Sequence, residues 1–172
     1  MTSDCRWNEH VMNMVRKANI KMWYLRRLKY FGASICTLKE VYILFIRQAL
    51  EFAAPLWTSS LSKMNIQNLE KLQSYATNLI LGPNKMSYEQ RMDRLDLISL
   101  ERRRWEITSS LENKFSKDSQ FQHRFPLWKC RETRSRTKFV EPRALTRRYR
   151  LSPVPTFIRL INQKEQHKSN KS

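Results

Sequence analysis

The chain has 172 residues and a formal net charge of +18 at pH 7, with only two glycines. This length suffices for one domain with a sizeable core, and so few glycines argue against a sheet-rich protein with many tight turns. The positive charge predicts a polyanionic partner, most often nucleic acid and less often an anionic membrane surface.

The excess charge is unevenly distributed along the chain. Residues 101–150 carry 15 basic and 6 acidic side chains, so half of the net charge lies in less than a third of the sequence. Residues 1–100 contribute a net charge of +6, and residues 151–172 contribute +3. We therefore expect the strongest attraction for a polyanion in the segment 101–150.

Three cysteines, Cys5, Cys36 and Cys130, are odd in number and far apart. This usage predicts reduced thiols in an intracellular protein, nuclear or cytoplasmic, rather than a disulfide framework. Residues 1–19 contain no long apolar core of the kind found in signal peptides. The apolar run at 41–57 is interrupted by charged side chains, which makes it too polar for a membrane span. We expect no membrane partner.

The first helix is predicted to run from about Asn8, a good N-cap residue, to Tyr30, with Gly32 as its C-cap glycine. Basic residues occupy the remaining faces and suit the helix dipole near the C-terminal end. A basic amphipathic helix can bind RNA or a membrane, but the favoured interpretation is a solvated face over a core stripe. The apolar positions of that stripe are Val11, Val15, Ala18, Met22, Leu25 and Leu28.

The most apolar run, residues 38–57, predicts a central helix. Thr37 and Glu40 have the spacing of a capping box, and Pro55 is predicted to end the helix because proline lacks an N–H donor. Apolar residues fill several faces, so we expect this helix to be buried nearly all round. One face is predicted at Leu38, Val41, Tyr42, Phe45, Ala49, Phe52 and Ala53.

Three further helices are predicted from their caps. Ser62 begins a helix that ends at Gly82, and Ser87 with Gln90 forms a capping box for a short helix. Ser99 caps a fifth helix. The expected core positions are Ile66, Leu69, Leu72, Ala76, Leu79 and Ile80 in the third helix, and Leu100, Ile107, Leu111 and Phe115 in the fifth.

Beyond the fifth helix the apolar periodicity fails. Residues 117–156 look loop-like, with one short strand expected near Thr137–Val140, and the polar end of the chain is predicted to be frayed. The sequence therefore predicts a mainly α-helical protein. Its expected parts are a bundle of about five helices over residues 1–116, an irregular basic and aromatic extension over 117–162, and a disordered tail over 163–172.

No catalytic constellation is visible. The three histidines are far apart, and two glycines cannot form a phosphate-binding loop. His123 and Cys130 supply at most two zinc ligands and lie in no CxxC motif. Asp93 and Asp96 fit solvated charges or helix caps better than a metal-binding pair. We therefore expect no metal and no cofactor.

Basic and aromatic residues alternate in the second half of the chain. Arginine binds phosphate groups bidentately, and aromatic rings stack on unpaired bases. The alternative is that some arginines pair with Glu101, Glu106 and Glu141 and that the aromatic rings are buried. The candidate nucleic-acid-binding residues are Arg102, Arg103, Arg104, Trp128, Arg131, Arg134, Arg136, Lys138, Arg143, Arg147, Arg148, Tyr149 and Arg150.

Eight short segments are informative through their order and spacing. They are Asp4–Val11, Lys17–Asn19 with Leu25–Lys29, Val41–Arg47, Leu50–Trp57, Leu69–Gln73, Ser87–Tyr88, Leu100–Arg103 and Arg148–Pro155. In this order the chain resembles the C-terminal part of reverse transcriptases from non-LTR retrotransposons, in particular the jockey-like group. Gln48 stands where that family usually has proline, and Phe52 where it usually has tyrosine; a helix tolerates both.

The resemblance implies the helical thumb and the segment after it, which in such enzymes grip the template–product duplex behind the active site. The family's polymerase centre, an aromatic-x-Asp-Asp turn with a further aspartate that together hold two metal ions, has no counterpart in this sequence. The implied function is a nucleic-acid-binding C-terminal fragment of an RNA-directed DNA polymerase. Its implied partners are RNA or an RNA–DNA duplex, and the remainder of a reverse transcriptase. The alternative is an adapted or decayed copy that acts as a helical interaction protein or has no function.

We predict that the purified chain extends no primer, with or without magnesium, because two-metal phosphoryl transfer needs carboxylates that converge on the ions. A primer-extension assay on the wild type and on the Asp93→Ala, Asp96→Ala double variant checks this. Extension by the wild type that the double variant loses would contradict the prediction.

Overall fold

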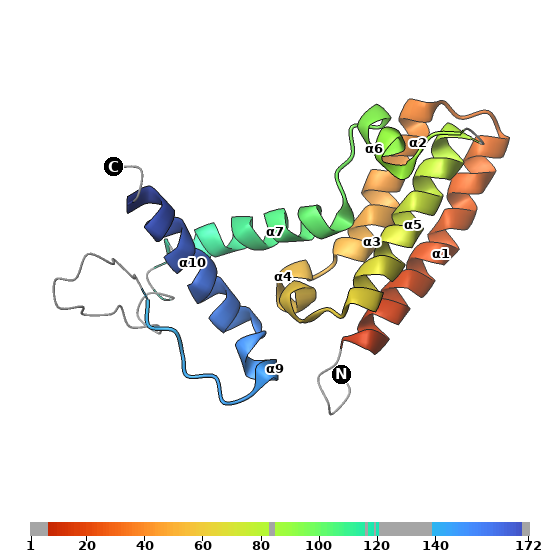
Figure 1. Ribbon diagram of the computed structural model, residues 1–172. Coiled ribbons are helices and arrows are strands. Elements are labelled where there is room, and N and C mark those ends of the chain that lie inside the picture. The colour runs from red at the N-terminus through yellow and green to blue at the C-terminus, as the bar shows by residue number, and fades with distance from the viewer. Residues whose placement is uncertain (1–6, 83–84, 116, 119, 121–138, 170–172) are drawn as a thin grey trace. The chain divides into compact units, whose positions relative to one another are not determined.

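Residues 7–82, 85–115, 117–118, 120 and 139–169 are described by the computed structural model. Within these ranges the chain is mainly helical and contains no β-sheet (Figure 1), which confirms the predicted fold class. The chain divides into two compact units: Met1–Ala53 with Leu61–Arg104, and Ala54–Ser60 with Trp105–Ser172. The expected boundary at residue 116 falls inside the second unit, which begins at Trp105 and also includes residues 54–60.

The first unit is a bundle built around two long helices. α1 (Asn8–Tyr30) packs along α5 (Lys63–Leu81), and the helical elements over residues 35–51 also pack against α1 (Figure 1). The other elements of this unit are α2 (Ile35–Val41), the π-helical turn η1 (Tyr42–Arg47), α3 (Gln48–Glu51), α6 (Tyr88–Arg94) and the start of α7 (Leu100–Phe115). The side chains that α1 buries are Val11, Met14, Ala18, Met22 and Leu25.

Two helix starts differ from the prediction. Asn8 is the first helical residue of α1 and does not cap it, because its Oδ1 accepts a hydrogen bond of 2.7 Å from Nδ2 of Asn65 on α5. The predicted capping box at Thr37 and Glu40 is wrong, since α2 already begins at Ile35. Ser34 caps it, and the Ser34 Oγ accepts a hydrogen bond of 3.1 Å from the Thr37 N–H.

Four other predicted helix boundaries are confirmed. Gly32 lies directly beyond α1 and its C-cap, with φ +81°. Its N–H donates to the Lys29 carbonyl and the N–H of Ala33 donates to the Leu28 carbonyl, which together form a Schellman motif. The Ser62 side chain caps α5, and Gly82 with φ +86° ends that helix. Ser87 and Gln90 form the full capping box at the start of α6, with both side-chain-to-backbone bonds present. Each of these signals is local in sequence, which is why the sequence suffices to find it.

The predicted central helix is divided into α2, η1 and α3. Its buried residues are spaced by four: Leu38, Tyr42, Ile46 and Leu50. A step of four overshoots the α-helical turn of about 3.6 residues, so such a series drifts around a regular α-helix. The π-helical turn, whose hydrogen bonds span one residue more, offsets this drift in the middle of the series. The four side chains therefore stay on the face that packs against α1 and α5.

The expectation that this segment is buried nearly all round is wrong. Phe45 and Phe52 are 57% and 68% exposed, and Leu44 is exposed as well. Helix α3 ends at Glu51, before the proline, because Phe52 has an extended ψ of 124° and Ala53 adopts a left-handed φ of 53°.

Pro55 does not end the central helix but lies in the first turn of the next one, α4 (Ala54–Trp57). A first-turn residue needs no intrahelical N–H donor, so proline is tolerated there.

Gln73 on α5 is fully buried and links three elements of the first unit. Its Oε1 accepts a hydrogen bond of 2.7 Å from the Tyr42 hydroxyl on η1. Its Nε2 donates to the Tyr88 hydroxyl on α6 at 3.1 Å and to the Ile98 carbonyl at 2.9 Å. Burial of a carboxamide is favourable only when its polar atoms are bonded in this way, so Gln73 specifies how these elements meet.

Glu70, one turn before Gln73, extends this network. Its carboxylate accepts hydrogen bonds from the Tyr88 hydroxyl at 2.9 Å and from the Glu101 N–H at 2.8 Å. The second bond satisfies a backbone donor in the first turn of α7, where a negative charge also suits the helix dipole. Burial and the neighbouring carboxylate of Glu70 raise the pKa of Tyr88 above its ordinary value. The Tyr88 hydroxyl therefore stays protonated and remains a donor to Glu70.

Helix α7 buries a different stripe from the predicted one. The Ser99 Oγ accepts a hydrogen bond of 3.3 Å from the Arg102 N–H, as expected of a cap. Leu100 is buried, but the other predicted core positions, Ile107, Leu111 and Phe115, are only half-buried. The remaining buried residues of α7 are polar: Arg104, Thr108 and Glu112.

The second unit contains a long helix that the sequence analysis missed. α10 (Pro153–Ser169) lies where a loop and then a disordered tail were expected. Its two prolines fall in the first turn, where they are tolerated. Val154, Phe157, Ile158 and Ile161 supply a regular apolar face, so the periodic signal was present. The other elements of this unit are α4, the 3₁₀ turn η2 (Thr58–Ser60), the rest of α7 and α9 (Arg147–Arg150).

Side chains of α10 hold two distant segments of the second unit. Asn162 accepts a hydrogen bond of 3.1 Å from the Phe139 N–H and donates one of 3.0 Å to the Phe139 carbonyl, so that its carboxamide pairs with the backbone as a strand would. The expected strand near residue 139 is represented in the described part of the chain only by a single bridge at Phe139. Lys164 forms an ion pair with the buried Glu112 and donates to the Asn113 side chain.

We predict that Gln73→Leu lowers the free energy of unfolding by about 3 kcal/mol, because the Tyr42 hydroxyl and the Ile98 carbonyl each lose a partner at about 1–3 kcal/mol. Phe45→Ala should change it by less than about 1 kcal/mol, since the ring is mostly exposed. Urea denaturation of both variants measures the difference. A larger loss for Phe45→Ala than for Gln73→Leu would contradict the prediction.

Candidate nucleic-acid interface

The run Arg102-Arg103-Arg104 at the start of α7 does not act as one basic surface. Arg102 is exposed. The Arg103 side chain pairs with Glu51, with 3.4 Å between Nε and the carboxylate oxygen. Arg104 is only 1% exposed, and burial lowers the pKa of its guanidinium group below the ordinary value. We therefore remove Arg104 from the candidate contact surface, because a buried guanidinium cannot reach a phosphate without unpacking.

Glu51 on α3 forms the acidic centre of a small ion-pair group. Its carboxylate lies 3.5 Å from Nε of Arg47 on η1, as well as 3.4 Å from Nε of Arg103. Its side chain is only 11% exposed. Burial raises the pKa of Glu51 above its ordinary value of 4.5, although the nearby arginines act in the opposite direction. This group joins α3 to α7 within the first unit.

In the described part of the second unit, the exposed arginines lie in and just before α9. Arg147, Arg148 and Arg150 are exposed, and so is Arg143 in the preceding segment. Tyr149 stands among them and is 42% exposed. We call these five residues the α9 arginine patch. Four guanidinium groups within eight residues, beside one accessible ring, form the densest exposed positive charge in the described part of the second unit.

The backbone under the α9 arginine patch is held in place. The Thr146 side chain caps α9 by accepting a hydrogen bond of 3.2 Å from the Tyr149 N–H. Arg159 of α10 donates to the Arg150 carbonyl and pairs with Glu141 at 3.5 Å. Glu141 is thereby occupied by Arg159. No ion pair to a guanidinium of the patch occurs among the residues that the structure describes.

Five of the candidate nucleic-acid-binding residues lie outside the described ranges: Trp128, Arg131, Arg134, Arg136 and Lys138. The two possible zinc ligands, His123 and Cys130, lie there as well. Asp93 and Asp96 are exposed, and Asp96 adopts a left-handed φ of 48° at the end of α6. The second aspartate therefore belongs to a helix terminus.

A cluster of exposed rings that was not predicted from the sequence lies at the C-terminal end of α1. Trp23, Tyr30 and Phe31 surround Arg27, whose guanidinium carbon lies 5.8, 5.7 and 5.1 Å from the three ring centroids. Their exposed fractions are 54%, 79% and 70%. We call these four residues the α1 aromatic–arginine cluster. Its signal was present in the spacing of Trp23, Arg27 and Tyr30 by four and three, which puts them on one face of the helix.

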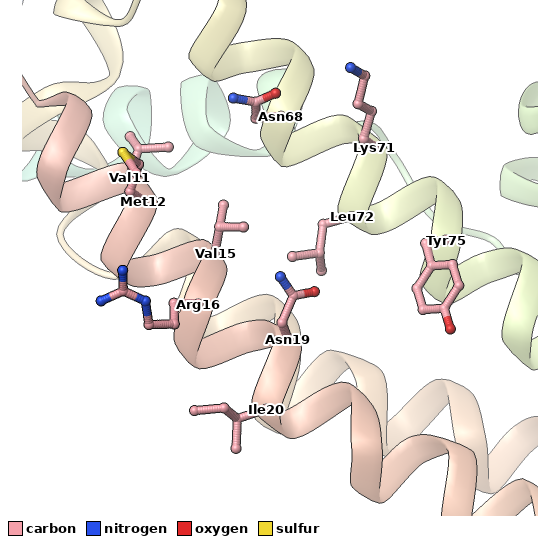
Figure 2. A pocket seen from close by; sticks show the side chains of 10 residues that line it. All are labelled: Val11, Met12, Val15, Arg16, Asn19, Ile20, Asn68, Lys71, Leu72 and Tyr75. Atoms are coloured by element: carbon pink, nitrogen blue, oxygen red, sulfur yellow. The ribbon is translucent and has the colours of Figure 1, made fainter.

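A groove of about 800 Å³ runs between α1 and α5 (Figure 2). Val15 and Leu72 face into it from the two helices, and Arg16 and Lys71 stand at its borders. Further along α5, Tyr75 lines the groove beneath Arg26, whose guanidinium carbon is 5.5 Å from the ring centroid. The groove is therefore apolar at its floor and basic at its edges.

Within the described ranges, no group of three or more His, Cys, Asp or Glu side chains is placed to hold a metal ion. No helix found there is both long and apolar enough to cross a membrane. Cys36 is an exposed free thiol, whereas Cys5 and Cys130 lie outside those ranges.

Comparison with models of protein families, with curated proteins and with solved structures gives no match. The resemblance to non-LTR retrotransposon reverse transcriptases therefore stays a prediction that depends on the eight ordered segments of the sequence.

The raised pKa of Glu51 gives a testable pH dependence. A raised pKa in the folded state means that protonated Glu51 favours folding below pH 4.5, and that this contribution is lost as the pH rises through the folded pKa. Glu51→Gln mimics the protonated side chain. We expect it to be more stable than the wild type at pH 7, with the difference vanishing at pH 4, in urea titrations at both pH values. The prediction is contradicted if Glu51→Gln is less stable than the wild type at pH 7 and this deficit is smaller at pH 4.

Proposed function

We propose that this chain binds RNA or an RNA–DNA duplex as the non-catalytic, C-terminal part of a polymerase related to non-LTR retrotransposon reverse transcriptases. The observation that carries the proposal is the α9 arginine patch: four exposed guanidinium groups without an acidic partner in the described part of the chain. Arginine suits this role because its planar fork binds phosphate oxygens bidentately and never loses its charge near neutral pH.

The support for a backbone-binding function is electrostatic. A net charge of +18 on 172 residues raises the local concentration of any polyanion around the protein. Phosphate contacts of this kind position a nucleic acid and carry no sequence information by themselves. We therefore propose weakly sequence-selective binding that depends strongly on salt. A helical bundle with a basic extension also accords with the thumb that the resemblance implies.

A helical interaction protein is the second candidate, and exposed apolar residues of the first unit favour it. Leu44, Phe45 and Phe52 are exposed on η1 and directly after α3. Exposed apolar residues in one region mark surfaces that another polypeptide covers. The remainder of a reverse transcriptase would be such a polypeptide under the first proposal as well. The absence of any salt-dependent binding to nucleic acid would leave the interaction protein as the better candidate.

We predict that changing Arg147, Arg148 and Arg150 to glutamine weakens duplex binding and flattens its salt dependence. Each neutralised phosphate contributes about 0.7–0.9 to the slope of log K against log salt, so losing three contacts should reduce the slope by about 2 to 3. Fluorescence anisotropy with a labelled RNA–DNA duplex at several salt concentrations measures this.

The matched control changes Lys63, Lys85 and Arg94 to glutamine. These residues are exposed in the first unit, so their substitution removes the same amount of charge outside the patch. Circular dichroism checks that both variants fold. An unchanged slope in a folded triple variant of the patch, or an equal change in the control, would remove the α9 arginine patch from the contact surface.

A further inference from the structure

The α1 aromatic–arginine cluster exposes rings that the first unit does not use for packing. Tyr30 and Phe31 contact each other edge to face, with centroids 5.6 Å apart, and both remain largely exposed. Trp23 contacts Tyr24 in the same manner at 5.1 Å. Rings that meet edge to face keep part of their faces accessible. The guanidinium group of Arg27 makes cation–π contacts with Trp23, Tyr30 and Phe31. The cluster is thus a preformed set of accessible aromatic faces.

The charge around the cluster selects the kind of ligand. Every charged residue of α1 after its first turn is basic, and these residues are Arg16, Lys17, Lys21, Arg26, Arg27 and Lys29. The single acidic residue of the helix, Glu9, lies in the first turn, at the opposite end from the cluster. Flat apolar rings among basic residues of the same helix suit a ligand that is both flat and anionic. Unpaired nucleotides have this combination, because each base offers a π-face and each phosphate a negative charge.

The shape of the adjoining surface suits an extended strand. Met12, Arg16 and Ile20 precede the cluster on the same stripe of α1, at the spacing of three and four that continues through the cluster. From Met12 to Tyr30 this stripe is about 27 Å long, at about 1.5 Å per residue. The groove between α1 and α5 borders it and adds Tyr75 and Lys71 from α5 (Figure 2).

We propose that the α1 aromatic–arginine cluster binds unpaired nucleotides of a single-stranded nucleic acid by stacking bases on Tyr30, Phe31 and Trp23, while Arg27 and its basic neighbours contact the phosphates. This site goes beyond the duplex-binding function, because it lies on the other unit and recognises base faces that a duplex hides. A protein helix fits less well, since docking its apolar face would bury the guanidinium group of Arg27 without a carboxylate to pair with it.

The test compares the Tyr30→Ala, Phe31→Ala double variant with the wild type, using a labelled oligouridylate and the labelled RNA–DNA duplex in parallel. The loss of two stacking rings predicts that affinity for oligouridylate falls by about 30-fold or more, whereas affinity for the duplex stays unchanged. Both residues are exposed, so the variant should fold, and circular dichroism verifies this. Tyr30→Phe should retain the affinity of the wild type, because it keeps the ring.

The matched control is the Phe45→Ala, Phe52→Ala double variant, which removes two exposed rings of the same unit outside the cluster. Its affinity for oligouridylate should equal that of the wild type. An equal loss in this control, an equal loss on the duplex, or no loss in the folded Tyr30, Phe31 variant would overturn the proposal. A change in sedimentation of the cluster variant with unchanged affinity would also overturn it, and would indicate a protein interface instead.

The proposed function and this inference fail in different measurements. Changing the α9 arginine patch tests the salt slope of duplex binding, whereas the cluster variant tests affinity for unpaired nucleotides at constant salt. An unchanged duplex slope together with a selective loss of oligouridylate binding would remove the α9 arginine patch and support the cluster.

Discussion

The first unit depends on one buried carboxamide. Gln73 has no exposed surface, and its oxygen and nitrogen are bonded to Tyr42, Tyr88 and Ile98, which come from three other parts of the unit. Apolar contacts alone would allow these elements to slide past one another, because dispersion is not directional. Hydrogen bonds to a buried side chain allow fewer arrangements, since any shift leaves a polar atom unsatisfied. The π-helical turn that presents Tyr42 to Gln73 is part of the same constraint.

The positive charge of the chain is divided between structural and exposed roles. Arg47 and Arg103 surround Glu51, and Arg104 is buried, so these residues contribute to the internal organisation of the first unit. In the second unit Arg159 supports the backbone of α9. The α9 arginine patch and the basic side chains of α1 are among the exposed groups that remain for a polyanion. Net charge predicts that a polyanion is attracted, whereas burial decides which guanidinium groups can touch it.

The two candidate surfaces suit different features of a nucleic acid. The α9 arginine patch offers many charges and one ring, an arrangement suited to phosphate groups that any duplex presents. The α1 aromatic–arginine cluster offers three rings around one guanidinium, which suits base faces that only unpaired nucleotides present. A polymerase fragment that meets both a duplex and a single strand would use both kinds of surface.

The sequence by itself determined the features that depend on neighbouring residues. Ser62, the Ser87 and Gln90 capping box, Gly32 and Gly82 act within one helical turn, so their chemistry is readable without the rest of the chain. The helical class and the excess of positive charge followed from composition and periodicity. The apolar face of α10 was readable as well, but its first-turn prolines resembled the signature of a loop.

Only the tertiary structure decided which residues are buried and what they contact. Gln73 meets Tyr42 across 31 positions of sequence, and Asn162 meets Phe139 across 23. Arg102, Arg103 and Arg104 are identical in type but differ in exposure, because their directions around α7 give them different neighbours. Phe45 belongs to an apolar run and is still exposed, since Lys21, Tyr24 and Leu28 of α1 border only part of that face. Such outcomes follow from packing between segments that are distant in sequence, which local patterns do not encode.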